Sequence, residues 1–412
     1  PIPMLRLIQG DVGSGKTVVA ALGAVQAVAN GMQAALMAPT EILAEQHRVN
    51  FESWLAPLGI RIAWLTGKLK GKGREVQLAA IADGSAQIVI GTHALFQEGV
   101  TFASLALVIV DEQHRFGVHQ RLALTEKASG QTLPHQLVLT ATPIPRTLSM
   151  VAYADLDCSV IDELPPGRTP VQTTLLDSQR RDQVIQRVGA GCGEGRQAYW
   201  VCTLIEESEN LDARAAEATA ELLQAQLPNL HIGLIHGRLP PADKEAMMAA
   251  FKAGKIELLV ATTVIEVGVD VPNANLMVIE HAERFGLFQL HQLRGRVSRG
   301  THPAFVCAFT TTNDPESNHR LTAFADNDNG FELAEIDLQI RGPGNLFSTQ
   351  QSGFPPLMIA DLIRDTDILK AAQHDARQLI EQDPDLEGGD YQRLRQLVFA
   401  RYGKALQLSD VG

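Results

Sequence analysis

The sequence has 412 residues, of which 45% are hydrophobic, 20% charged and 5% aromatic. This composition excludes a disordered chain, a collagen-like fibre and a small disulfide-stapled scaffold, and the length predicts two or three domains of about 150 residues each. The formal net charge of -12 counts mildly against nucleic acid as the partner, because nucleic-acid-binding proteins usually carry basic surfaces.

Cysteine usage and hydropathy indicate the compartment. Four scattered cysteines without a C-x-x-C pair give no metal-site spacing and indicate a reducing environment. Apolar runs such as Leu105–Val110 are far shorter than the roughly 18 residues of a membrane span, and the N-terminus carries no signal peptide. The chain begins at Pro1 without a Met, which favours a start inside a longer protein. We therefore expect a cytoplasmic protein without a membrane partner.

Short apolar runs alternate with segments of helical periodicity. The first series of predicted strands is Met4–Gln9, Gln33–Ala38, Ile60–Leu65, Gln87–Ile90, Leu105–Val110 and Gln136–Leu139. The second series is Gln172–Leu176, Gln197–Cys202, His231–Ile235, Glu257–Ala261, Asn275–Ile279 and Ala304–Phe309. Strands that alternate with helices in this way are typical of α/β proteins with mainly parallel sheets.

A segment rich in Pro and Gly, Leu164–Pro170, separates the two series and is typical of a linker. We expect one α/β lobe at 1–160, a linker at 161–173, a second lobe at 174–340, and a mixed or helical tail at 341–412. Residues 1–155 hold 12 basic and 11 acidic residues, whereas 156–340 hold 15 basic and 26 acidic ones. The acidity therefore belongs to the second lobe, and the first is near neutral.

The first predicted strand leads into GDVGSGKT, which fits the phosphate-binding pattern G-x-x-x-x-G-K-[ST] and precedes a helical run. Small residues let backbone N–H groups point at phosphate oxygens, while the Lys and Thr serve the β/γ-phosphates and Mg²⁺. A glycine-rich turn without a ligand is the alternative, and the Lys-Thr pair with its flanks disfavours it. The residues expected to bind ATP here are Gly10, Asp11, Val12, Gly13, Ser14, Gly15, Lys16 and Thr17.

The fifth predicted strand ends in Asp111 and Glu112, at the strand terminus where α/β sheets bind ligands. We expect Asp111, with Thr17, to hold Mg²⁺, and Glu112 to orient and polarise the attacking water. A pair of solvated acids closing a strand is the alternative, but the phosphate-binding loop earlier in the chain makes it the weaker interpretation.

Six further motifs follow predicted strands or lead into helices. They are Ala38–Gln46, Gly91–Leu95, Thr140–Thr147, His236–Leu239, Ala261–Pro272 and His291–Gly300. Any one of them could be a loop with a helix cap, and Pro39-Thr40-Glu41 is a capping context by itself. Together they resemble a superfamily 2 nucleic-acid motor with two tandem RecA-like lobes.

Three stretches make the resemblance narrower: DEQHRFGVHQR at Asp111–Arg121, TATPIPRT at Thr140–Thr147, and IRGPGNLFSTQQSG at Ile340–Gly353. They are similar to the RecG family of bacterial ATP-dependent DNA helicases, whereas the related transcription-repair coupling factors usually carry Glu where Gln113 stands. The resemblance implies a helicase or double-stranded DNA translocase that reverses stalled forks and migrates Holliday junctions in recombination and repair. It also implies a bacterial, nucleoid-associated monomer with single-stranded DNA-binding protein as a partner.

The resemblance assigns roles to individual residues. Those expected in catalysis are Lys16, Asp111, Glu112, Gln292, Arg296 and Arg299, the last two as arginine fingers rather than a solvated basic helix start. Further nucleotide contacts are expected from Gln113, His114, Gly268 and Asp270, and a link from hydrolysis to lobe movement from Thr140 and Thr142. DNA phosphates are expected to meet Thr40, Thr92, His93, Arg238, Thr262, Thr263 and Arg341.

Some features depart from the family or stay open. Ser298 replaces a Gly of the last helicase motif, and we expect a small residue to be sufficient there. The family's N-terminal wedge domain is not part of the sequence, so we expect weak ATP binding and little stimulation by forked DNA. The basic loop Gly67–Arg74 is equally compatible with a DNA contact and with a solvated loop. A motor for transcription-coupled repair or RNA, or a scaffold that lost its chemistry, remains the alternative function.

Overall fold

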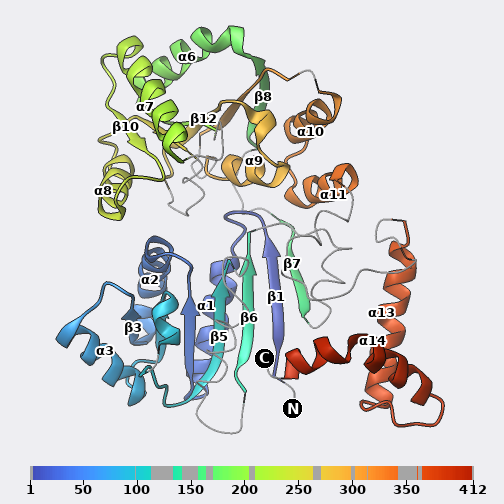
Figure 1. The fold of residues 1–412 in the computed structure, drawn as a ribbon. Helices are drawn as coiled ribbons and strands as arrows, with labels where there is room; N and C mark the ends of the chain where they lie inside the picture. Colours follow the sequence, from blue (N-terminus) through green and yellow to red (C-terminus); the bar gives the residue numbers. More distant parts are fainter. Residues whose placement is uncertain are drawn as a thin grey trace.

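The computed structural model describes residues 3–97, 99–112, 133–141, 156–163, 170–203, 209–262, 271–297, 302–312, 314–341, 360 and 364–410. Two α/β lobes lie one above the other, and two long helices near the C-terminus lie beside the first lobe (Figure 1). Each lobe is built on its own parallel sheet, and the two sheets share no strand.

The first lobe contains a seven-stranded sheet in the order β3-β4-β2-β5-β6-β1-β7, with every neighbouring pair parallel. Its strands are β1 (Leu5–Gly10), β2 (Gln33–Met37), β3 (Ile62–Leu65), β4 (Ile88–Gly91), β5 (Leu105–Asp111), β6 (His135–Thr140) and β7 (Asp157–Ile161). Its helices are α1 (Lys16–Ala29), α2 (Glu41–Leu55), η1 (Ala56–Leu58), α3 (Gly71–Ala82) and η2 (His93–Phe96).

Three hydrophobic clusters of described residues include strands of this sheet, and the two larger ones pack it against helices. One includes Ala20 and Ala24 of α1 and Phe51 of α2, and the other includes Ile81 of α3. All five residues of β2 are buried, because helices lie against both faces of the sheet. The carboxyl ends of the strands consequently form the open edge that faces the second lobe in Figure 1.

The second lobe contains a six-stranded parallel sheet in the order β10-β11-β9-β12-β13-β8. Its strands are β8 (Gln172–Asp177), β9 (Gln197–Val201), β10 (Ile232–Ile235), β11 (Leu258–Ala261), β12 (Ala274–Ile279) and β13 (Phe305–Thr310). Its helical elements are η4 (Ser178–Arg180), α6 (Arg181–Gly193), α7 (Glu209–Gln226), α8 (Pro241–Lys252), η6 (Ala282–Arg284), α9 (Leu287–Arg294), α10 (Pro315–Asp326) and α11 (Gly330–Arg341).

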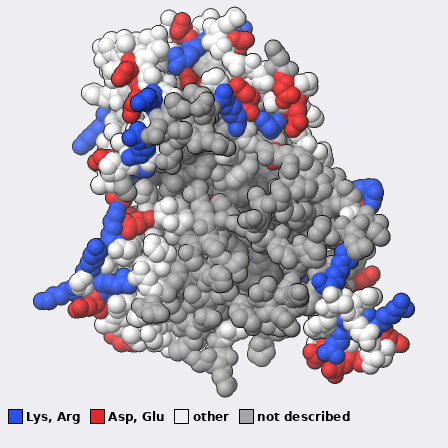
Figure 2. Space-filling model, viewed as in Figure 1, with Lys and Arg blue, Asp and Glu red and all other residues white. Residues whose placement is uncertain are grey.

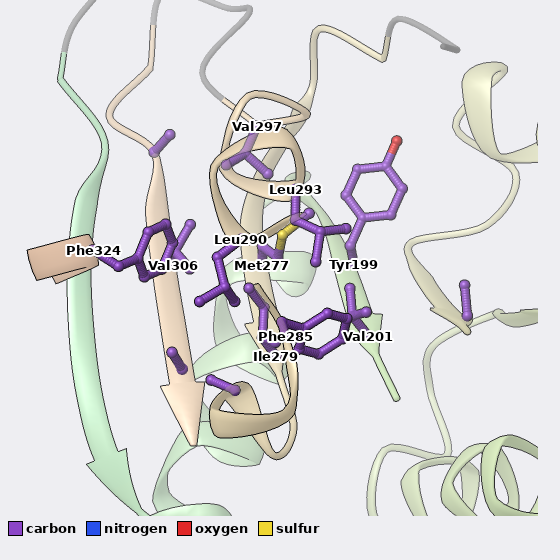
Figure 3. Packing of buried hydrophobic residues seen from close by; sticks show 14 of the residues in the cluster. Tyr199, Val201, Met277, Ile279, Phe285, Leu290, Leu293, Val297, Val306 and Phe324 are labelled. Carbon is purple, nitrogen blue, oxygen red and sulfur yellow. The ribbon is translucent and has the colours of Figure 1, made fainter. Parts of the chain in front are cut away.

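Helix α9 is anchored in the largest core of this lobe. Leu290 and Leu293 point into a cluster with Met277 and Ile279 of β12, and Phe324 of α10 packs in the same cluster (Figure 3). His291 of this short helix contacts the first lobe, with its Nε2 2.7 Å from Asp11 Oδ1. The core therefore fixes the position from which this histidine acts.

The C-terminal region consists of α13 (Thr366–Gln382) and α14 (Gln392–Asp410). An ion pair links this region to the first lobe, with Arg377 Nη2 3.8 Å from Asp157 Oδ1 on β7. None of the helices in the described ranges is long and apolar enough to cross a membrane.

The predicted fold class is confirmed: two parallel-sheet α/β lobes and a helical C-terminal region. Each predicted strand overlaps an observed one, but β7 was not predicted. Its sequence, DCSVI, lacks a continuous apolar run, because the strand lies at an edge with two exposed and three half-buried residues. The first sheet ends at Ile161 and the second begins at Gln172, so the expected linker, 161–173, overlaps both sheets by its terminal residues.

Candidate functional site

The phosphate-binding loop connects β1 to α1. Gly13 and Gly15 adopt positive φ angles of 80° and 99°, a conformation that side-chain-bearing residues rarely adopt. A Cβ on Gly10 would collide with Ser14 Oγ and lie 3.2 Å from Ile161 O, so glycine suits the tight return of the loop at that position. The loop thus has the backbone geometry that the motif predicts, and it ends at the N-terminus of α1.

Lys16 is the first residue of α1, and the residue is 9% exposed. Its Nζ donates hydrogen bonds to the carbonyl oxygens of Gly10 at 2.6 Å and Asp11 at 2.8 Å. The ammonium therefore lies over the loop, where the N-terminal N–H groups of α1 also attract anions. This donor set and the adjacent Thr17 hydroxyl fit a triphosphate with Mg²⁺.

Asp111 and Glu112 lie at the carboxyl end of β5, as predicted. Asp111 Oδ2 is 2.7 Å from Nε2 of His47 on α2, and both side chains are nearly buried. His47 was not a predicted site residue, because only the folded packing of α2 on the sheet brings it to Asp111. The bond fixes the direction of a carboxylate expected to act on Mg²⁺.

Glu112 has a φ of 55°, in the left-handed region that favours glycine. Its N–H donates to Leu139 O at 2.9 Å, and its Oε1 accepts a hydrogen bond from Ala141 N at 3.3 Å. Non-glycine residues held in this conformation cost of order 1–3 kcal/mol and cluster at active sites. The contact also joins Glu112 to the Thr140–Thr147 motif, of which Thr140 is buried and Thr142 lies outside the described residues.

The second lobe contacts the phosphate-binding loop through α9 and the residues after it. His291 Nε2 lies 2.7 Å from Asp11 Oδ1, and a Cβ on Gly295 would lie 3.0 Å from Val12 Cβ. Gln292 and Arg296 belong to the same segment and are each 8% exposed, whereas Arg299 lies outside the described residues. The structure therefore brings the predicted catalytic segment of the second lobe onto the loop that holds Lys16.

His291 and Arg294 are functional candidates that the sequence reasoning missed. Arg294 Nη2 lies 3.0 Å from His291 Nδ1, and the Arg294 side chain is 3% exposed. Both residues stand within the motif His291–Gly300, but the resemblance directed attention to its Gln and the two later arginines. A buried arginine needs partners, and besides His291 those of Arg294 are Phe324 O on α10, 30 positions further along the chain, and Asp328 just after that helix.

The predicted DNA contacts fall into two groups. His93 and Arg238 are exposed, whereas Thr92 and Thr262 are only 2% and 3% exposed. Thr40 Oγ1 caps α2 by accepting a hydrogen bond from Leu43 N at 3.3 Å. Burial and capping thus favour the two exposed residues as direct phosphate contacts.

The remaining predicted positions lie outside the described residues. They are Gln113, His114, Thr263, Gly268, Asp270, the departure at Ser298, and the side chain of Arg341, whose backbone ends α11.

Charge on the described surface is mixed. Figure 2 shows Lys and Arg side chains interspersed with Asp and Glu over the described parts of both lobes and the C-terminal helices. The basic segment Gly67–Arg74 is not a loop throughout, because its last four residues form the first turn of α3. Within it, Lys68 Nζ lies 2.8 Å from Glu41 Oε2 and 2.5 Å from Glu245 Oε1 on α8. Lys68 is therefore engaged between the lobes rather than displayed alone for DNA.

Three family models match the chain in order. They are the DEAD/DEAH box helicase at 4–151, the helicase conserved C-terminal domain at 175–301, and the C-terminal part of domain 3 of the ATP-dependent DNA helicase RecG at 327–406. The curated ATP-dependent DNA helicase RecG of Escherichia coli strain K12 is 61% identical over 93% of the chain. That of Pasteurella multocida strain Pm70 is 59% identical over 94%. Over nearly its whole length the chain is therefore similar to the RecG helicases. It spans 56% of the length of each of these two relatives.

Solved structures agree with this similarity. A structure of RecG bound to a three-way DNA junction superposes with a TM-score of 0.73 at 42% identity, covering 89% of this chain and 48% of that one. Dbp5 of S. cerevisiae bound to RNA and ADP BeF3 gives a TM-score of 0.59 at 16% identity over 83% of this chain and 90% of that one. The second likeness shows the two-lobe fold alone, whereas the first supports the predicted family.

Proposed function

We propose that this chain is the ATP-driven motor of a helicase that moves along double-stranded DNA and remodels branched DNA during recombination and repair. The observation that carries the proposal is the docking of the α9 segment of one lobe on the phosphate-binding loop of the other. A motor of this kind needs ATP hydrolysis on one lobe to change the position of the other. The contact between α9 and the phosphate-binding loop would transmit that change. The RecG structure bound to a three-way junction supports branched DNA as the substrate.

Different residues would bind the phosphates, hold the metal ion and activate the attacking water. Lys16 and the N–H groups of residues 13–17 would hold the phosphates, and Thr17 with Asp111 would hold Mg²⁺, which neutralises phosphate charge when bound. Glu112, held by Ala141 N, would orient the attacking water and accept its proton. Arg296 and Arg299 would stabilise charge on the transferring phosphoryl group, an effect of roughly 10³ to 10⁵ in rate.

The other predicted residues complete the proposal. Gln292, Gln113, His114, Gly268 and Asp270 are proposed to contact the nucleotide or to report its state, as in the family. His93 and Arg238 are proposed to contact DNA phosphates directly, because both are exposed. Thr40, Thr92, Thr262, Thr263 and Arg341 complete the proposed DNA set, and for Thr92 and Thr262 a contact requires local rearrangement.

The similarity to the RecG helicases supports three further proposals. We propose that the protein acts in the bacterial cytoplasm at the nucleoid, as a monomer, and cooperates with single-stranded DNA-binding protein. Co-sedimentation with that protein, and sedimentation equilibrium of the chain alone, test the last two.

The test of the function is the ATPase rate with forked DNA, linear duplex, single-stranded DNA and RNA. We expect the DNAs that contain duplex to stimulate most, and Lys16→Ala to abolish hydrolysis because the phosphates lose their cation. Lys252→Ala, an exposed lysine at the end of α8, is the matched control and should retain the rate.

Two outcomes would change the proposal. Greater stimulation by RNA than by any DNA would indicate a different motor of the superfamily. A wild-type rate equal to that of Lys16→Ala would indicate a scaffold without chemistry.

A further inference from the structure

A series of hydrogen-bonded side chains connects the phosphate-binding loop, through α9, to the end of α10. Asp11 Oδ1 meets His291 Nε2 at 2.7 Å, and His291 Nδ1 meets Arg294 Nη2 at 3.0 Å. Arg294 Nη1 then donates to Phe324 O at 2.8 Å and lies 3.4 Å from Asp328 Oδ1. The exposed fractions of the His291 and Arg294 side chains are 8% and 3%, so little water competes for these bonds.

The arginine fixes the direction of the bonds. A guanidinium carries only donors, so the His291 Nδ1 that faces it must accept. The single ring proton of this tautomer is then on Nε2, which donates to the Asp11 carboxylate. Polarity therefore runs from Arg294 through His291 to Asp11, and a hydrogen bond to a carboxylate is of the stronger, charge-assisted kind.

Arg294 is itself held by the helical pair α10–α11. Its guanidinium carbon lies 4.6 Å from the centroid of the Phe324 ring, near the end of α10, and Asp328 stands in the turn before α11. Burial lowers the pKa of Arg294, and the charges of Asp328 and Asp11 oppose that effect. A displacement of the α10–α11 turn must therefore displace Arg294 or break its bonds.

Asp11 is where this series reaches the nucleotide site. Its backbone oxygen accepts from Lys16 Nζ, and its side chain accepts from His291. A phosphate that draws the Lys16 ammonium away from the Asp11 carbonyl changes the position of the same residue that His291 holds. Asp11 is thus bonded to the nucleotide-binding Lys16 through its backbone and to the second lobe through its side chain.

We propose that His291 is a positioning residue that couples the phosphate-binding loop to the α10–α11 pair. The proposal rests on the proposed ATPase function, because the coupling is to the nucleotide site. It assigns to His291 no contact with substrate: the residue acts on the loop through Asp11 and on the helical pair through Arg294.

The test begins with His291→Phe, which keeps the ring volume and removes both hydrogen bonds. We expect the kcat of the DNA-stimulated ATPase to fall about tenfold, the size of effect expected for the loss of a buried charge-assisted bond, while the KM for ATP changes less than twofold. His291→Gln retains a donor that can reach Asp11 and should recover part of the rate. His231→Phe alters an exposed histidine of the same lobe, paired with Glu257, and should have no effect.

A second measurement reads the coupling without hydrolysis. Hydrogen–deuterium exchange of residues 315–341 is followed with and without a non-hydrolysable ATP analogue. We expect the analogue to change protection of this segment in the wild type and not in His291→Phe, while protection of the phosphate-binding loop changes in both.

The outcomes separate the two proposals. A response of 315–341 that is equal in both proteins, or absent from the wild type, overturns the coupling role even if ATP is hydrolysed. If the wild-type protein does not hydrolyse ATP, the proposed function is wrong. The exchange measurement still decides the role of His291, because it does not depend on hydrolysis.

Discussion

Among the described residues, the contacts between the lobes include two contrasting places. At the phosphate-binding loop the contact is buried, with Gly295 against Val12 and the His291 side chain 8% exposed. Near α2 and α8 the contact is Lys68 between Glu41 and Glu245, and the Lys68 side chain is 59% exposed. Exposed ion pairs contribute about 0–1 kcal/mol, whereas breaking a buried polar contact costs more. Of these two contacts, the one at the nucleotide site therefore constrains the relative position of the lobes more strongly.

After Lys16→Ala, the largest effect is expected at the nucleotide site from Glu112→Gln, a change at a half-buried residue. Loss of the carboxylate removes the group that accepts the proton of water, so the ATPase rate should fall by roughly 10² to 10⁴. ADP binding, measured by calorimetry, should stay within twofold, because Glu112 does not hold the phosphates. Glu257→Gln in the second lobe is the control, and a rate for Glu112→Gln within tenfold of the wild type would contradict the assignment.

Gly295→Val should break the buried contact sterically. The new side chain would begin 3.0 Å from Val12 Cβ, and overpacking of this kind costs about 1–3 kcal/mol. We expect the ATPase rate to fall about ten- to hundredfold, because the lobes must separate to admit the methyl groups. Gly193→Val at the end of α6, where a Cβ meets open space, is the matched control. Equal rates for the two variants would show that the lobes do not need this approach.

His47→Phe sharpens the comparison by removing a buried bond inside one lobe instead of between lobes. Asp111 then loses a hydrogen bond in a nearly buried position, and the free energy of unfolding of the first lobe should fall by about 1–3 kcal/mol. Chemical denaturation measures this change. An unchanged midpoint would show that the bond does not stabilise the lobe.

The smallest effect is expected from Lys68→Ala, less than twofold in ATPase rate, and the difference from the wild type should vanish at high salt. Hydrogen bonds with Glu245 and Glu41 raise the pKa of Lys68 to about 12. A raised pKa means that the pair is complete below the ordinary value of 10.5 and is lost only as the pH rises through about 12. The effect of the substitution should therefore be flat from pH 6 to 9, and a slope there would implicate another group.

The sequence predicted the strands and the phosphate-binding loop because each depends on the pattern of a few neighbouring residues. An apolar run predicts a buried strand such as β2, and the spacing of glycines before Lys16 predicts the phosphate-binding loop. Strand β7 was not predicted, because its position at an edge removes the apolar pattern that a central strand requires.

The bonds that connect the elements were not predictable in the same way. His47 reaches Asp111 only after α2 packs on the sheet. His291 and Asp11 are 280 positions apart in the sequence and meet only when the two lobes come together. The burial of Thr92 is likewise a tertiary property, since its motif predicts a hydroxyl at a strand end and nothing about what covers it. Such positions require the fold before their neighbours can be named.

Strand β7 has a mechanical consequence. It pairs with β1 on the side opposite β6, so the strand that leads into the phosphate-binding loop is hydrogen-bonded along both edges. A force applied along β1 loads two ladders in shear at the same time, and their hydrogen bonds must yield together rather than one by one. An outermost β1 would share that load with a single neighbour. The inconspicuous edge strand thus doubles the number of ladders that resist a pull on the loop.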